Sequence, residues 1–264
     1  GVFALVGNLG TWNIVAAQDY IEESGVPSVY WGTGSSYQYF NPAEGNERYT
    51  FPVQPIYNTE GRIMYLRAIN IQTNPDQPEV IFAQINSTTA TELASQVQLV
   101  KDCDVVIIAG NQTYFQAAYT AMQTADVRKP VITSYVNIAP ATVPDEAVDA
   151  NASDIYGGAW VIIDDSADER QKADFTRFVG ICTWGVEKGI ISQSIADSYM
   201  ISAYAMSSFI ALEVFMEGIN RLADKEITRE AFLEAMESAP INVPISGGVN
   251  YANGQRIGLD GMSF

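Results

Sequence analysis

The fold is decided by residues 2–36, VFALVGNLGTWNIVAAQDYIEESGVPSVYWGTGSS. The apolar run at 2–6 is rich in β-branched and aromatic residues, which is typical of a strand buried on both faces, and the glycines after it end the strand. A helix is predicted over about 11–24 with Gly25 as its left-handed C-cap, and a second strand at 27–31. The stretch is therefore a βαβ unit, a motif that binds ligands at the carboxyl ends of its parallel strands.

The composition is that of a globular protein and argues against several classes of function. The 264 residues are 47% hydrophobic, and 14 basic against 31 acidic residues give a net charge of −17. Because this charge repels phosphate backbones and anionic lipid surfaces, nucleic acid is not expected as a partner. The sequence contains no histidine, which excludes Ser-His-Asp and Cys-His catalysis and zinc sites that need imidazole. We therefore expect no enzyme, no catalytic residue, no metal and no cofactor.

Three smaller features have plain structural interpretations. Cys103 and Cys182 show none of the spacings of metal or redox motifs, so they are predicted to be buried small apolar residues. Residues 199–216 approach membrane-spanning length, but Glu213 lies inside them, and a buried helix is favoured. The chain opens on a predicted core strand, so a signal segment is not expected within it.

Strands and helices alternate along the rest of the chain. Further strands are predicted at 49–54, 80–83, 104–109, 130–134 and 157–163. Helices are predicted from about 59, after the capping box Thr89-x-x-Glu92, at 114–124, at 167–183 after the capping box Ser166-x-x-Glu169, at 194–222, and at 229–238 with Thr228 as N-cap. A closing hairpin is predicted around Asn253-Gly254, a type I′ turn signal.

This alternation predicts an α/β protein of mostly parallel sheets with helices on both faces. Pro52 and Pro55 mark a crossing between two bodies, so two such bodies are expected. The first body receives only three predicted parallel strands, too few to cover its four helices. We therefore expect further strands upstream of Gly1.

Several motifs, in this order, resemble the branched-chain amino-acid type of extracellular solute-binding protein, the type I periplasmic binding fold of ABC importers. They are VGNLGT, GVPSVYWGTGSS, TFPVQPIYNTEGR, DVVIIAGNQTYFQAA, VITSYVNIAP, GINRLADKEITREAFLEAMES and PISGGVNYANGQRIG. The resemblance covers nearly the whole chain. It implies two doubly wound lobes joined by hinge strands, with lobe 1 formed by 1–54 and 165–243 and lobe 2 by 55–164 and 244–264. The sequence departs from the family in lacking a leading βαβ unit before Gly1 and a strand and helix at about 71–79.

The resemblance also implies a function without catalysis. A family member captures a small solute between its lobes outside the cytoplasm, in the periplasm or as a cell-surface lipoprotein, and delivers it to the membrane permease of an ABC importer. A monomer is expected. The alternative is the ligand-sensing domain of a membrane receptor, which shares the fold and the pocket.

On the first lobe the candidate ligand-binding residues follow the two opening strands. A hydroxyl at Thr11, in the first turn of a helix, can join free backbone amides and the positive end of the helix dipole to hold a carboxylate, as the matching family position does. Thr11 as a simple helix cap is the alternative. Trp12 either walls the pocket or packs on a lobe face.

The second turn, Gly32, Thr33, Gly34 and Ser35, offers close backbone approach and hydroxyl groups for the polar head of a ligand. A flexible turn without a ligand is the alternative. Neither opening turn has the lysine of a P-loop or the glycine spacing of a dinucleotide site, so nucleotide binding is not favoured.

On the second lobe, Asn111 and Tyr135 stand at positions that contact the ligand in the family, and Gln112 is adjacent to the first of them. Tyr199 either closes the pocket or belongs to the core. The family position of Tyr135 tends to be a carboxylate that pairs with the ligand's ammonium group. Since tyrosine carries no charge and an unpaired buried ammonium is costly, a carboxylic acid or a neutral amide fits at least as well as an amino acid, unless another acid reaches the site.

Overall fold

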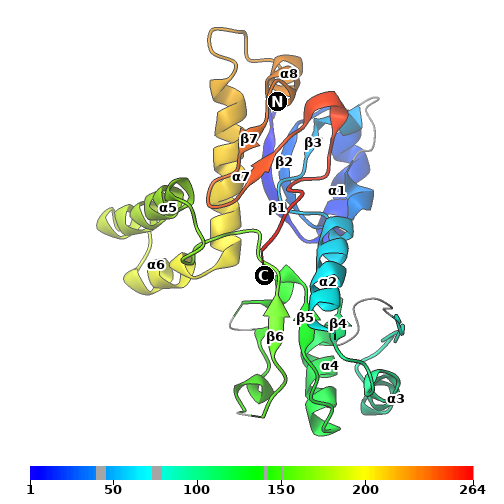
Figure 1. Cartoon of the computed structure of the whole chain (residues 1–264). Helices are drawn as coiled ribbons and strands as arrows, with labels where there is room; N and C mark the ends of the chain where they lie inside the picture. The colour runs from blue at the N-terminus through cyan, green and yellow to red at the C-terminus, as the bar shows by residue number, and fades with distance from the viewer. Residues whose placement is uncertain (40–45, 73–78, 140–141, 150, 264) are drawn as a thin grey trace. The chain divides into compact units, whose positions relative to one another are not determined.

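The computed structural model describes residues 1–39, 46–72, 79–139, 142–149 and 151–263. It consists of two compact units, coloured by position along the chain in Figure 1. Unit 1 combines 1–59 with 160–261, and unit 2 combines 60–159 with 262–264. Each unit has its own parallel sheet.

The sheet of unit 1 is built on the predicted βαβ unit. Strands β1 (Leu5–Leu9), β2 (Ser28–Gly32) and β3 (Thr50–Phe51) pair in parallel in the order β1-β2-β3, and α1 (Thr11–Ser24) connects the first two. The left-handed C-cap at Gly25 is confirmed, with its N–H donating to Glu22 O. The first strand begins at Leu5 and not at the predicted Val2. It lies at the edge of the sheet, with Val6 and Leu9 exposed.

Four helices complete unit 1: α5 (Glu169–Glu187), α6 (Gln193–Met200), α7 (Ala203–Asn220) and α8 (Arg229–Glu237). The single helix predicted at 194–222 is in fact α6 and α7, which meet at a bend of 82°. The break follows from Ser202, whose hydroxyl accepts from Ala205 N and starts a new helix. Among the described helices none is long and apolar enough to cross a membrane alone, although the bent pair reaches that length and composition together.

Unit 1 also contains a short antiparallel ribbon, β7 (Ile241–Asn242) with β8 (Gly248–Val249). The hairpin predicted at Asn253-Gly254 is wrong, because a 3-10 turn occupies 252–254 there and no strand follows it among the described residues up to 263. The segment was expected in the second lobe, but it bonds to unit 1. The Tyr251 hydroxyl donates to Pro52 O at 2.7 Å, and Leu259 N donates to Val53 O at 2.9 Å.

Unit 2 holds a second parallel sheet, β4 (Val106–Ile108), β5 (Val131–Thr133) and β6 (Ile155–Gly157), in that order. Its helices are α3 (Ala90–Val100), α4 (Gln112–Thr124) and most of α2 (Tyr57–Ile71), which joins the unit from Glu60 onward. The core between β4, β5 and the helices α3 and α4 includes the fully buried Phe115, Tyr119 and Val131. The α/β architecture with parallel sheets is thus confirmed.

Two predicted strands of this region are wrong. Residues 80–83 form no strand, and Val80 and Phe82 are exposed, because apolar composition makes a strand only where a partner strand is present. The strand predicted at 157–163 lies instead at 155–157, and beyond it only Ala159 forms an isolated bridge, to Ser263. Of the region 71–79, where a family element was expected to be missing, residues 73–78 lie outside the described residues.

Both predicted capping boxes are also wrong. Thr89 makes no side-chain cap, because Glu92 accepts instead from the Ser87 amide and hydroxyl. Helix α5 is capped by Asp168 and not by Ser166. Gln171 N donates to Asp168 Oδ1 at 2.7 Å, and Asp168 N donates to Gln171 Oε1 at 2.8 Å, which is a full capping box two residues later. The N-cap at Thr228 is confirmed, since its hydroxyl accepts from Ala231 N.

Candidate functional site

In unit 1 the two predicted turns meet at the carboxyl ends of β1 and β2. Thr11 Oγ1 and Thr33 Oγ1 share a hydrogen bond of 2.7 Å, although 22 residues separate them. Thr11 is the first residue of α1, and Gly10 is the N-cap with no side-chain cap bond, so Thr11 does not cap its helix. The structure therefore places two hydroxyl groups together beside the N-terminus of a helix, an arrangement suited to a carboxylate or another hydrogen-bonding anion.

The second turn is held close to strand β1. A Cβ atom on Gly32 would lie 2.8 Å from Leu9 Cδ1 and 3.1 Å from Asn8 O, so only glycine fits without displacement. Ser35 N donates to Thr33 Oγ1 at 3.1 Å, and Gly34 O accepts from Tyr57 N at 2.7 Å. These hydrogen bonds hold the turn in place, in contrast to the alternative of a flexible turn.

The two predicted aromatic residues of unit 1 lie on the surface. Trp12 is 84% exposed, and Tyr199, near the end of α6, is 44% exposed. Tyr199 is therefore not a core residue of unit 1. Neither side chain joins the Thr11–Thr33 pair through a described contact.

In unit 2 the predicted residues gather at the carboxyl ends of β4 and β5. Asn111 is the N-cap of α4, and its side chain accepts from Tyr114 N. Gln112 Nε2 donates to Val136 O at 3.0 Å, which ties the start of α4 to the loop after β5. Tyr135 is in that loop and is only 8% exposed. The structure thus brings Asn111, Gln112 and Tyr135 to one edge of the sheet, as the strand order predicts.

Two residues at this edge were missed by sequence reasoning. Glu60, in the first turn of α2 and 3% exposed, accepts from Tyr135 N at 2.7 Å and from Ser134 Oγ at 3.0 Å. Asn137 donates from Nδ2 to Gly110 O at 2.8 Å and to Thr133 Oγ1 at 2.9 Å. The only sequence signal for Asn137 is a polar residue shortly after a strand. Glu60 gives none, because its partners are more than 70 residues away in the sequence.

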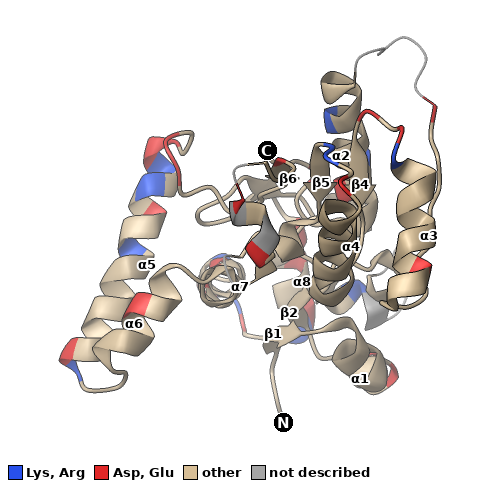
Figure 2. Ribbon diagram, turned by 90° about the horizontal axis from the view of Figure 1, so that it is seen from below, with Lys and Arg blue, Asp and Glu red and all other residues tan. Residues whose placement is uncertain are grey.

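Burial governs the charge of Glu60. Removal from water disfavours the carboxylate, and the hydrogen bonds from Tyr135 and Ser134 favour it. The first effect is the larger, so the pKa of Glu60 is raised above its ordinary value. Figure 2 shows that α4 carries no Lys, Arg, Asp or Glu, whereas charges of both signs occur along α5.

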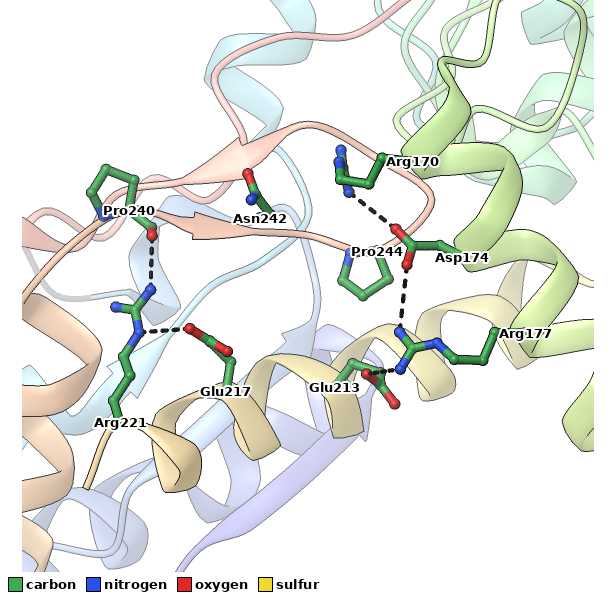
Figure 3. Close-up of a pocket in the computed structure, with 9 residues that line it drawn as sticks. All are labelled: Arg170, Asp174, Arg177, Glu213, Glu217, Arg221, Pro240, Asn242 and Pro244. Carbon is green, nitrogen blue, oxygen red and sulfur yellow. Dashed lines mark hydrogen bonds and ion pairs between the residues drawn. The ribbon is translucent and has the colours of Figure 1, made fainter. Parts of the chain in front are cut away.

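Unit 1 contains a cavity of about 220 Å³, enclosed by α5, α7 and the ribbon segment (Figure 3). The arginines in its wall are paired with its acids. Arg177 bridges Asp174 on α5 at 3.5 Å and Glu213 on α7 at 2.7 Å, and Arg221 donates to Glu217 at 2.8 Å. The arginines and acids of the wall neutralise one another, and the ion pair of Arg177 with Glu213 links α5 to α7.

Unit 2 contains a second cavity, of about 550 Å³, beside β6. It is lined by residues that include Asn137, Ile138, Asp149, Ile155 and Gly157. Neither cavity is lined by a predicted ligand-binding residue. Within the described ranges no three Cys, Asp or Glu side chains form a group that could hold a metal ion.

Solved structures share the fold over almost the whole chain. A substrate-binding protein of an ABC transporter from Aeropyrum pernix matches 99% of this chain and 72% of its own, with a TM-score of 0.69 and 13% identity. A possible leucine/isoleucine/valine-binding protein from Rhodopirellula baltica SH 1 matches 99% and 74%, with a TM-score of 0.65 and 13% identity.

A type 1 periplasmic binding protein from Bordetella pertussis Tohama I matches 97% of this chain and 76% of its own, with a TM-score of 0.63 and 12% identity. No family model and no curated protein matches the sequence. The fold is therefore that of type I periplasmic binding proteins, as the sequence motifs predicted. At identities of 12–13% the similarity concerns the fold alone.

Proposed function

We propose that the chain is the solute-binding component of an ABC importer that acts outside the cytoplasm. It captures a small organic solute bearing a carboxylate or an amide between its two lobes, carries out no chemistry on it, and delivers it to a membrane permease. The observation that carries the proposal is the hydroxyl pair of Thr11 and Thr33, held at 2.7 Å beside the N-terminus of α1 in a fold shared with substrate-binding proteins.

The arrangement of donors supports this proposal. The first backbone N–H groups of α1 have no partner within the helix, and they carry the positive end of its dipole. Hydroxyl groups beside them add donors that rotate to suit the solute. Asn111, Gln112 and Tyr135 at the sheet edge of unit 2 add neutral polar groups. Such a set of neutral hydrogen-bonding groups suits reversible binding of a solute.

The proposal is tested by thermal unfolding of the chain with a panel of amino acids, aromatic and aliphatic acids, and small amides. A true solute at about 100 times its Kd should stabilise the folded state by about 2.7 kcal/mol. The shift should disappear in a T11A/Y135A double variant.

The matched control is the double variant T176A/Y20A, which removes the same side-chain types from exposed positions. It should keep the full shift. A shift that survives in T11A/Y135A would contradict the assignment of the site, and a panel without any shift would contradict the solute classes proposed.

A further inference from the structure

Three motifs in unit 2 match the Asn-X-Ser/Thr acceptor of N-linked sugars, and the structure places them in different surroundings. They are Asn86-Ser87-Thr88, Asn111-Gln112-Thr113 and Asn151-Ala152-Ser153. A transferase that modifies a folded chain has to bind the asparagine amide together with the hydroxyl two residues later. The motif must therefore lie in an exposed surface segment with both groups free.

Two of the three motifs are tied to helix α4. Asn111 is the N-cap of that helix, where its side chain accepts from Tyr114 N, and Thr113 is in the first helical turn. In the third motif Ser153 is only 7% exposed, and its hydroxyl accepts from Gln123 Nε2 at 3.0 Å. One asparagine is thus held by its cap and the other motif has a buried hydroxyl, so neither motif is free.

The motif at Asn86 has free side chains on a backbone that is held in place. Asn86 and Thr88 are exposed, in a segment that is neither helix nor strand. Asn86 Oδ1 accepts from Gln84 Nε2 at 2.9 Å, whereas Asn86 Nδ2 and the Thr88 hydroxyl bond to no residue in the described part of the chain. Glu92 of α3 fixes the backbone by accepting from Asn86 N and Ser87 N. The two groups that a transferase needs are therefore presented together at the surface.

Exposed apolar side chains lie just before this motif. Val80, Ile81 and Phe82 are 52%, 45% and 89% exposed, while Ile85 packs against the core of unit 2. Because four residues span at most about 14 Å, an oligosaccharide of several sugars on Asn86 reaches Phe82. A bulky, hydrophilic group at Asn86 would cover an apolar run that is otherwise left in water.

We propose that Asn86 carries an N-linked oligosaccharide, which covers the apolar segment 80–82. This inference goes beyond solute binding and takes from the proposed function only the place outside the cytoplasm, where this modification occurs. In the transfer a bond forms between Asn86 Nδ2 and the anomeric carbon of the first sugar, and the bond from that carbon to the phosphate of an activated oligosaccharide donor breaks. The amide gives one proton to a base of the transferase, and the phosphate leaves with the electron pair.

The test is peptide mass spectrometry on the chain purified from the cells that naturally make it, with the chain from a strain that lacks the transferase as reference. Trypsin separates the three motifs into the peptides 68–101, 102–128 and 129–170. Only peptide 68–101 should be heavier than the reference, by a whole number of sugar residues. The added mass should disappear in N86Q and T88A and persist in T88S, which keeps the hydroxyl. It should also persist in the control T89A, which changes the neighbouring exposed threonine that caps no helix through its side chain.

Three mass results would overturn the inference: an unmodified peptide 68–101 in the naturally made chain, an added mass that survives N86Q, or sugar on one of the other two peptides with none on 68–101. Solute binding is measured separately by thermal unfolding, so the proposed function stands or fails independently of these masses.

The covering role is measured with a fluorescent dye that binds exposed apolar surface. Naturally made N86Q should bind more dye than the naturally made wild type, because the segment 80–82 loses its cover. The double variant F82S/N86Q should return dye binding toward the wild-type level. Equal dye binding by N86Q and the wild type would show that the segment is not covered by sugar, and would overturn the inference.

Discussion

At the scale of single residues, Gly258 is held in a place that no other residue can occupy. Its φ is +67°, and an added Cβ would lie 2.1 Å from Gln54 O and 2.9 Å from Val53 O. We expect G258A to lower the free energy of unfolding by about 2 kcal/mol or more, from left-handed strain and overpacking together. Urea denaturation measures this. The control G261A, where no atom lies within 4 Å, should unfold like the wild type, and equal midpoints for the two variants would contradict the prediction.

Glu237 makes stability depend on acid. It is held by Arg48 and by the buried Arg256, whose Nη2 donates at 2.7 Å. Burial opposes its charged form, but the two arginine bonds outweigh burial and lower its pKa below the ordinary value of 4.5. Glu237 therefore stabilises the folded state above pH 4.5, and this stabilisation is lost as the pH falls through the lowered pKa of the folded protein.

We expect E237Q to lower the free energy of unfolding by about 2 kcal/mol at pH 7. Between about pH 5 and pH 3 the variant should lose less stability than the wild type. Chemical denaturation at each pH gives both quantities. E169Q changes an exposed glutamate of α5 and should leave the acid profile unchanged. An acid profile of E237Q that parallels the wild type would rule out this role.

The candidate site could be predicted only in part from the sequence, and the residues show why. Thr11 and Thr33 follow strands that the hydrophobic pattern identifies, so their neighbouring positions at one sheet edge were predictable. The hydrogen bond between them was not, because it depends on rotamers. Glu60 could not be found, since its importance arises from burial against Ser134 and Tyr135, which are distant in the sequence.

At the scale of secondary-structure elements, the start of α5 shows which of two candidate N-caps is used. The pattern Ser166-x-x-Glu169 and the observed box of Asp168 with Gln171 are two residues apart, and the second is the one whose side chains reach the free amides. We expect D168A to cost about 1 kcal/mol of stability. S166A, which removes an exposed hydroxyl bonded to Asp164, should cost much less when both are measured by thermal unfolding. The reverse order would contradict the structural assignment.

Elements with partners in the sheet were predictable, and those without partners were not. The strands β1, β2, β4 and β5 follow from short apolar runs between glycine and proline signals, near the predicted positions. Residues 80–83 show a similar apolar run but make no strand, because pairing is a tertiary property that a local pattern cannot report. The break between α6 and α7 depends in the same way on a single cap, that of Ser202.

At the scale of the whole molecule, the charge of −17 sets the response to salt. Without histidine this charge changes little between pH 6 and pH 8. Like charges repel most in the compact state, and salt shortens the range of that repulsion from about 30 Å at 0.01 M to about 10 Å at 0.1 M. We expect the melting temperature to rise by a few degrees, equivalent to about 1 kcal/mol, between 0.01 and 0.2 M sodium chloride.

Choline chloride should give the same rise, since screening does not depend on the identity of the cation. A rise with sodium alone would indicate a specific cation site, and a fall in melting temperature with either salt would contradict the prediction.

The division of the chain has a consequence for biosynthesis. Unit 2 is a nearly continuous stretch, 60–159, whereas unit 1 joins the first 59 residues to a segment that begins at residue 160. Helix α7, which contacts β1 and β2, is therefore translated long after them. At the rate of translation, α7 is synthesised on the order of ten seconds after β1 and β2. The inserted unit 2 can fold first. Until α7 is synthesised, β1 and β2 stay uncovered, so chaperones can bind them during translation.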